Sequence, residues 1–301
     1  MSTNTPRFKA LVINPNTSTH MTEALKPIVA KLNYTDTQVD YFTAPSTPVT
    51  LPDGRVIEGI PSINSGADSA RSALHCRPFV EALIPQYDAF LVACYSAHPL
   101  VGMLRATSRA LENSARENGM GEPVSLDRKR YVTGIFEASV TTSLMLISAF
   151  RLVDERSLHK AQAPETFGIV TTGKVWEAEL TKAVTEMIVG SSSDSEAEGS
   201  QYVSTRFAGV ETTGLTAGEL HEMPAEEVRR RMSAATETLL TNAPLPVRAV
   251  CLGCAGMAGM EEAVRDGCIK AYGEVEGNNV HIIDGVVAGM GMLVNACKAD
   301  L

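Results

Sequence analysis

Short apolar runs alternate along the chain with longer segments in which apolar residues recur at helical spacing. This alternation is typical of parallel α/β architecture, in which each strand is followed by a helix that returns the chain to the same sheet edge. In the first half, the runs predict strands at Phe8–Ile13, Val39–Phe42 and Ala89–Ala93. The longer segments predict helices at Thr19–Leu32, at Ser65–Leu83 with an interruption near Pro78, and from Pro99 to about Asn113.

The second half repeats this plan. Strands are predicted at Thr166–Val170 and Val247–Leu252, and helices at Val175–Ile188 and from Met257–Asp266 onward. In each half, a strand, a Thr-containing turn and a helix follow one another. Roughly 80 residues later, a strand, a cysteine and a second helix follow in the same order. A duplicated α/β half-domain explains the repetition, and chance recurrence of a common motif is the alternative.

Composition and charge narrow the class of protein. With 301 residues, 44% of them hydrophobic and 20% charged, the chain is long enough for two modest domains with their own cores. A net charge of −9 without a basic stripe argues against nucleic acid or an anionic membrane as partner. The polar segment Met1–Lys9 does not resemble a signal peptide, and no apolar run spans a bilayer convincingly. We therefore expect a cytoplasmic protein that binds a small molecule.

Two of the six cysteines stand where ligands bind in parallel sheets, beyond the carboxyl end of a strand. Cys94 follows the run Phe90–Ala93, and Cys254 follows Ala249–Gly253. Both are expected near a helix N-terminus, which can lower a thiol pKa and make the thiolate a usable base. Two such cysteines could face each other across a cleft. The other four are expected to be plain buried residues: Cys76, Cys251, Cys268 and Cys297.

Cys251 and Cys254 also form a C-x-x-C pair, which admits two alternatives. A thioredoxin-like dithiol sits at a helix start, whereas Cys251 lies inside a predicted strand. A zinc site needs about four ligands, and the chain has no second C-x-x-C, although Cys94 and His98 could complete a set. Neither alternative is preferred, and we expect no metal.

Polar turns follow the first strand of each half. They comprise Asn14–Ser18 in the first half and Thr171–Gly173 in the second. Their side chains could cap the following helix, or they could hold a polar ring or carboxylate of a ligand. His98 and Glu137 are single polar residues near these turns, and both are interpreted as structural.

These residues resemble the hydantoin racemase branch of the aspartate/glutamate racemase superfamily, which includes allantoin racemases. The matching motifs extend in family order from residue 8 to about residue 290. They are Ile13–Ser18, Gly59–Ser65, Ala93–Ser96, Gly134–Ala138, Phe167–Thr172 and Leu252–Met257. The first and last of these are the most specific.

The resemblance implies two pseudo-symmetric α/β half-domains with parallel sheets and an active-site cleft between them. We expect residues 1–105 and 260–301 to form the half-domain of Cys94, and residues 106–259 to form that of Cys254. The resemblance further implies catalysis by these two cysteines, no cofactor and a homo-oligomer. The positions that would line the substrate are Asn16, Thr17, Ser96, Thr171 and Thr172. One departure affects the substrate: after the first cysteine many members have a small residue and then Asp-Pro-Gly, whereas the stretch Tyr95–Leu100 of this chain lacks the acidic group and has His98 one position on.

The implied reaction is a 1,1-proton transfer on a 5-substituted hydantoin or allantoin. One thiolate removes the proton α to a ring carbonyl, and the opposite thiol returns a proton to the other face. Two alternatives remain. A superfamily decarboxylase would keep a single cysteine, so the presence of both Cys94 and Cys254 favours the racemase. A sensor of a hydantoin-type nitrogen metabolite would bind the same ligand without turnover.

Overall fold

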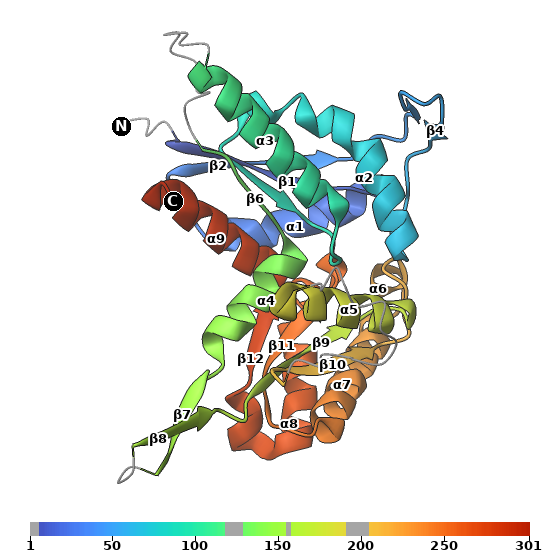
Figure 1. Cartoon of the computed structure of the whole chain (residues 1–301). Coiled ribbons are helices and arrows are strands. Elements are labelled where there is room, and N and C mark those ends of the chain that lie inside the picture. Colours follow the sequence, from blue (N-terminus) through green and yellow to red (C-terminus); the bar gives the residue numbers. More distant parts are fainter. Residues whose placement is uncertain (1–5, 118–128, 155–157, 191–204) are drawn as a thin grey trace, which may run out of the picture. The chain divides into compact units, whose positions relative to one another are not determined.

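The structure is a computed structural model that describes residues 6–117, 129–154, 158–190 and 205–301 (Figure 1). The chain divides into two compact units. Unit 1 comprises Met1–Ala138 and Gly285–Leu301, and unit 2 comprises Ser139–Asp284. Each unit contains one four-stranded parallel sheet with helices against it, so the predicted fold class is confirmed.

The sheet of unit 1 has the strand order β2-β1-β5-β6. Its strands are β1 (Phe8–Asn14), β2 (Thr37–Thr43), β5 (Ala89–Val92) and β6 (Tyr131–Gly134). All three pairings are parallel. The two central strands are buried along almost their whole length, as expected for a sheet with helices on both faces.

The helices of unit 1 are α1 (Thr19–Lys31), α2 (Gly66–Glu81), α3 (Pro99–Glu117) and α9 (Gly285–Ala299), and a short 3-10 helix, η1, covers Ile84–Gln86. Leu11, Ile13 and Phe90 share one core cluster with residues of α2 and α3. On α9, a Cβ at Gly289 would come 2.5 Å from Leu91 Cδ1, so a glycine there lets the last helix lie directly against β5. Pro78 lies inside α2, and the helix continues through it without interruption.

The sheet of unit 2 has the order β10-β9-β11-β12, again parallel throughout. Its strands are β9 (Thr166–Thr171), β10 (Phe207–Thr212), β11 (Val247–Gly253) and β12 (His281–Asp284). In chain order, both sheets therefore place the second strand beside the first and the third strand on the first strand's other side. The predicted internal repeat is confirmed at the level of topology.

The helices of unit 2 are α5 (Val175–Val189), α6 (Glu219–Glu222), α7 (Ala225–Asn242) and α8 (Glu261–Asn278), and the 3-10 helix η2 covers Ala255–Met257. Residues of α7 and α8 share a core cluster with Val170, Val250 and Leu252 of the sheet. Helix α4 (Ile135–Leu146) begins in unit 1 and continues into unit 2. The described residues also form two antiparallel hairpins. One pairs β3 (Val49–Thr50) with β4 (Val56–Ile57), and the other pairs β7 (Phe150–Asp154) with β8 (His159–Gln162).

The predicted half-domain boundaries at residues 105 and 259 differ from those of the structure. The chain leaves unit 1 inside α4, after Ala138, and returns between Asp284 and Gly285. Strand pairing explains the difference, because β6 pairs with β5 and must stay in unit 1, and β12 pairs with β11 and must stay in unit 2. The helix expected from Met257 was also misplaced, since α8 begins at Glu261. Within the described residues, no helix is long and apolar enough to cross a membrane.

Candidate active site

The carboxyl ends of β1 and β5 bring two of the predicted motifs together in unit 1. Ile13 pairs with Val92, and the Ala93 N–H donates to the Ile13 carbonyl at 2.8 Å. The turn that follows β1 and the segment that contains Cys94 therefore start side by side at one edge of the sheet.

Asn16 and Thr17 are held by bonds within and around the turn that follows β1. The buried Asn16 side chain accepts from the Ser18 N–H at 2.9 Å through Oδ1, and its Nδ2 donates to Met21 Sδ at 3.5 Å. The Thr17 N–H donates to the Ile60 carbonyl at 2.9 Å, which joins this turn to the loop before α2. Asn16 thus shapes the turn before α1, but the capping interpretation is wrong: Ser18 is the N-cap residue of α1, and its side chain makes no capping hydrogen bond.

The thiol of Cys94 is half-buried and lies beside a hydroxyl group. Cys94 Sγ lies 3.6 Å from Oγ of the buried Ser96. Ser69 of α2 donates its hydroxyl to Ser96 Oγ at 3.2 Å. Ser96 is therefore oriented from a second element, and a chain of hydroxyls leads from the interior to the thiol.

His98 connects the Cys94 segment to the turn after β1. The Leu100 N–H donates to His98 Nδ1 at 3.3 Å, so the ring proton belongs on Nε2, which lies 3.4 Å from Ser72 Oγ. Ser72 in turn donates to the Pro15 carbonyl at 2.7 Å. Burial lowers the pKa of His98 to about 4, so the imidazole is neutral near pH 7. Its interpretation as a structural residue is supported by these bonds.

Unit 2 brings the other predicted motifs together at the carboxyl ends of β9 and β11. Thr171 pairs with Gly253, and its buried hydroxyl donates to the Gly253 carbonyl at 2.6 Å. A Cβ at Gly253 would come 2.6 Å from Thr171 Cβ and 2.7 Å from the Val170 carbonyl, so only glycine fits there. The neighbouring Thr172 is also buried, and its carbonyl accepts from the Gly214 N–H at 3.1 Å.

Cys254 follows Gly253 directly and caps the short helix η2. Its sulfur accepts from the Gly256 N–H at 3.3 Å. Burial raises the pKa of the Cys254 thiol to about 11, and the N–H groups of Gly256 and Met257 oppose this only in part. The predicted lowering of this pKa is therefore wrong. The physical reason is that α8 begins seven residues after Cys254, so the thiol receives the N–H groups of one 3-10 turn and no α-helix N-terminus.

Cys94 is likewise separated from its helix, because α3 begins at Pro99. The other four cysteines are buried as predicted, with Cys251 inside β11 and its sulfur 3.1 Å from Ser143 Oγ. None of the six cysteines forms a disulfide. Within the described residues, no group of three or more His, Cys, Asp or Glu side chains could hold a metal ion, so the C-x-x-C pair lacks the ligands of a zinc site.

Three residues near these motifs were not predicted. Ser69 and Ser72 reach the Cys94 segment from α2, and their spacing together with Ser65 places the three serines on one helix face, a signal available in the sequence. In unit 2, a Cβ at Gly256 would come 3.0 Å from His221 Nε2 and 3.6 Å from Cys254 Sγ. His221 therefore lies beside the Cys254 turn, and nothing in the sequence pattern indicates this.

Glu137 follows the carboxyl end of β6, at the start of α4. Its Oε2 is buried without a hydrogen-bond partner, and burial raises the pKa of its carboxyl group. The Arg105 charge lowers that pKa only in part. The carboxyl group is thus biased toward its neutral form, which suits a structural residue.

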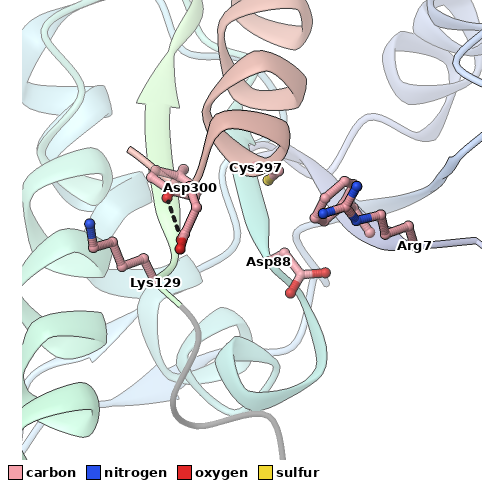
Figure 2. A pocket seen from close by; sticks show the side chains of 7 residues that line it. Arg7, Asp88, Lys129, Cys297 and Asp300 are labelled. Atoms are coloured by element: carbon pink, nitrogen blue, oxygen red, sulfur yellow. Dashed lines mark hydrogen bonds between the residues drawn. The ribbon is translucent and has the colours of Figure 1, made fainter.

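Three cavities in the described part of unit 1 contain none of the predicted site residues. Figure 2 shows one of about 190 Å³, lined among others by Arg7, Asp88, Lys129, Cys297 and Asp300. It is found where the strands begin, since Phe8 opens β1 and Tyr131 opens β6, and both line it. The other two have volumes of about 460 and 400 Å³.

The structure thus groups one set of predicted residues at the carboxyl ends of β1 and β5 in unit 1: Asn16, Thr17, Cys94 and Ser96. The other set lies at the carboxyl ends of β9 and β11 in unit 2: Thr171, Thr172 and Cys254. Each cysteine follows the third strand of its sheet, and each is adjacent to the polar turn that follows the first strand. Chemically, each edge offers a thiol, hydroxyl groups and main-chain N–H groups.

Comparison with known proteins identifies the family of the chain. The sequence profile of the Asp/Glu/Hydantoin racemase family matches residues 11–110 and 131–293. The uncharacterized protein C1F7.10 of Schizosaccharomyces pombe is 31% identical over 294 residues, which are 98% of this chain and 94% of that protein. Protein DCG1 of Saccharomyces cerevisiae is 23% identical over 278 residues, with 87% and 89% covered.

Two solved structures share the fold. The allantoin racemase from Klebsiella pneumoniae is similar with a TM-score of 0.63 and 21% identity, over 98% of this chain and 89% of that one. The allantoin racemase from Pseudomonas fluorescens is similar with a TM-score of 0.60 and 20% identity, over 97% and 92%. Because the family profile covers most of the chain, this protein belongs to the Asp/Glu/hydantoin racemase family of isomerases.

Proposed function

We propose that this enzyme racemises a hydantoin-type ring compound, either a 5-substituted hydantoin or allantoin, with Cys94 and Cys254 as the two acid–base groups. The observation that carries the proposal is the repeated placement of a cysteine. In each of two sheets with the same topology, the third strand ends in a cysteine beside the polar turn of the first strand. A reaction that needs one proton carrier on each face of a stereocentre uses such a pair.

The proposed reaction is a 1,1-proton transfer. One cysteine, as thiolate, takes the proton from the ring carbon α to a carbonyl, and the electron pair of the broken C–H bond moves into the ring as an enolate. The other cysteine, as thiol, then donates a proton to the opposite face. The enzyme ends with the two protonation states exchanged, so the next turnover runs in the reverse sense or follows proton exchange with solvent.

The raised pKa of the Cys254 thiol supports different roles for the two cysteines in the resting enzyme. With a pKa of about 11, Cys254 is a thiol near pH 7 and is ready to donate a proton. We propose that Cys254 acts as the acid for one enantiomer, for which Cys94 is the base. For the opposite enantiomer, Cys254 must act as the thiolate, and the Gly256 N–H at 3.3 Å would stabilise it.

The polar groups around each thiol would hold the ring. We propose that Asn16, Thr17 and Ser96 in unit 1, and Thr171 and Thr172 in unit 2, contact the substrate through hydroxyl, amide or main-chain groups. Developing charge on the enolate oxygen would be stabilised by main-chain N–H groups of these turns. Because two solved structures that share the fold are allantoin racemases, allantoin is the first substrate to test.

The test uses separate enantiomers of allantoin and of several 5-substituted hydantoins. Optical rotation measures racemisation, and NMR in D₂O measures exchange at the stereocentre. Cys94→Ser and Cys254→Ser should each lose racemisation by at least about 10³-fold, because serine is a far weaker acid–base group at neutral pH. Each variant should still exchange deuterium into one enantiomer only, and the two variants should differ in which one.

Cys297→Ser serves as the matched control, since Cys297 lies at the opposite end of the unit 1 sheet, where the strands begin. It should racemise like the parent. If Cys94→Ser and Cys254→Ser also racemise like the parent, the thiol mechanism is wrong. If the parent binds these rings but neither racemises them nor exchanges their protons, the protein is a binding protein for such compounds and no catalyst of this reaction.

A further inference from the structure

The hairpin of β7 and β8 forms an arm on unit 2, defined here as residues 150–162, of which 150–154 and 158–162 are described. Figure 1 shows it extending beyond the sheet of that unit. Within the described part of the chain, β7 and β8 pair with each other, and no other helix or strand packs closely against either. Every residue of β7 is exposed.

The exposed residues of the arm are unusually apolar. Phe150 is 72% exposed, Leu152 52%, Val153 53% and Leu158 73%. Met145 at the end of α4, next to the arm in sequence, is 72% exposed. Single exposed apolar side chains are ordinary, but several of them within one short hairpin indicate an interaction site.

Hydrogen bonds fix the base of the arm, so the arm has a defined position on unit 2. The Ala163 N–H donates to the Ala149 carbonyl at 3.1 Å and continues the hairpin ladder toward the body. The Ser148 N–H donates to Glu165 Oε2 at 2.6 Å. Gln162 Nε2 donates to Thr205 Oγ1 at 3.0 Å. A two-stranded hairpin that buries neither face is marginally stable by itself, so the arm requires a partner surface.

We propose that the arm packs against unit 2 or unit 1 of a second copy of this chain, and that two copies exchange arms in a two-fold dimer. The distribution of charge along the chain favours a second copy of the protein as the partner of the arm. The described part of the arm contains Arg151 and Lys160 against Asp154, a net charge of +1, whereas the chain as a whole carries −9. A basic, apolar arm is therefore complementary to the acidic body of another copy.

The exposed area is sufficient for a stable dimer. The four exposed apolar side chains of the arm and Met145, next to it in sequence, each expose on the order of 100 Å², which gives roughly 500 Å² per copy, and this surface covers a similar area of its partner. Because a two-fold axis repeats the contact, the two arms together bury roughly 2,000 Å², within the range of stable interfaces.

The experiment measures the mass of the full chain in solution by light scattering after gel filtration, at about 20 µM. The parent should have at least twice the monomer mass of 32.1 kDa. The double variant Phe150→Ser, Leu152→Ser should run as a monomer with an unchanged circular dichroism spectrum. The double variant Arg151→Glu, Lys160→Glu should weaken association about tenfold, since it reverses the charge of the arm.

Val275→Ser is the matched control, because Val275 on α8 of the same unit is 74% exposed but lies outside the arm. This variant should keep the mass of the parent. A monomeric parent, or a Phe150→Ser, Leu152→Ser variant that keeps the parent's mass, overturns the proposal. So does a parent that is monomeric and sediments with phosphatidylserine vesicles through the same side chains, since the arm would then dock on a lipid surface.

Discussion

The imidazole of His98 lies 3.4 Å from the hydroxyl of Ser72, and this buried pair joins three segments that are distant in sequence. His98 belongs to the loop after β5, Ser72 to α2, and the hydroxyl of Ser72 donates to Pro15 in the turn after β1. A neutral imidazole that is bonded at both ring nitrogens thus fixes the loop that begins with Cys94.

Protonation of His98 should destabilise the protein at mildly acidic pH. Its folded pKa of about 4 lies below the unfolded value near 6.5, so the unfolded state takes up the proton first as the pH falls. The stability present above pH 6.5 is therefore lost progressively between pH 6.5 and pH 4, by about 3 kcal/mol at most. Urea unfolding at several pH values measures this loss.

His98→Gln should flatten that part of the pH profile, at the expense of some stability at pH 7. His20→Gln is the control, because His20 is an exposed residue of α1. An unchanged slope between pH 6.5 and pH 4 in His98→Gln would contradict the assignment.

Thr171→Val should destabilise unit 2 by about 1–3 kcal/mol. The change keeps the side-chain volume but leaves the buried Gly253 carbonyl without the hydroxyl that donates to it at 2.6 Å. Thr181→Val is matched to it, because the Thr181 hydroxyl also donates to a carbonyl at 2.6 Å but on the exposed face of α5. The control should change the free energy of unfolding by less than about 0.5 kcal/mol. Equal effects of the two changes would show that burial of the bond is unimportant.

Gly253→Ala and Gly102→Ala should have opposite effects. A Cβ at Gly253 would meet the Val170 carbonyl at 2.7 Å and Ile169 Cγ2 at 2.9 Å, and neither main-chain strand can move without breaking its pairing. We expect a loss of at least about 2 kcal/mol and a displaced Cys254. Gly102 lies in α3 with nothing within 4 Å of an added Cβ, so alanine there should stabilise by about 0.5–1 kcal/mol. Thermal unfolding of the two variants distinguishes them, and a neutral Gly253→Ala would refute the close approach of β9 and β11.

The Cys254 thiol should ionise only in strongly alkaline solution. Thiolate absorbance near 240 nm, followed as a difference between the parent and Cys254→Ser, should rise with a midpoint near pH 11. Because the unfolded thiol ionises near pH 8.5, the folded state loses stability relative to the unfolded state as the pH rises from about 9 to about 11. A midpoint below about pH 8.5 would instead support the lowered pKa expected from the sequence pattern.

Much of the fold could be predicted because its local signals agree. The apolar runs gave β1, β5, β9 and β11 to within one or two residues, since buried parallel strands are nearly continuous apolar segments. The short edge strands β6 and β12 were not predicted, because an edge strand of four residues carries too little pattern. For this reason the unit boundaries were also misplaced, as pairing between strands distant in sequence decides them.

The sequence by itself determined which cysteines stand at strand ends and which polar turns accompany them, because these properties depend on order along the chain. Only the tertiary structure decided what surrounds them. The bond from Thr171 to Gly253, the hydroxyl of Ser69 beside Ser96, and the His221 ring beside Cys254 all join residues that are far apart in sequence. The same holds for the Cys254 pKa, because burial is a property of the packed chain, and here it outweighs the few N–H groups that the local turn supplies.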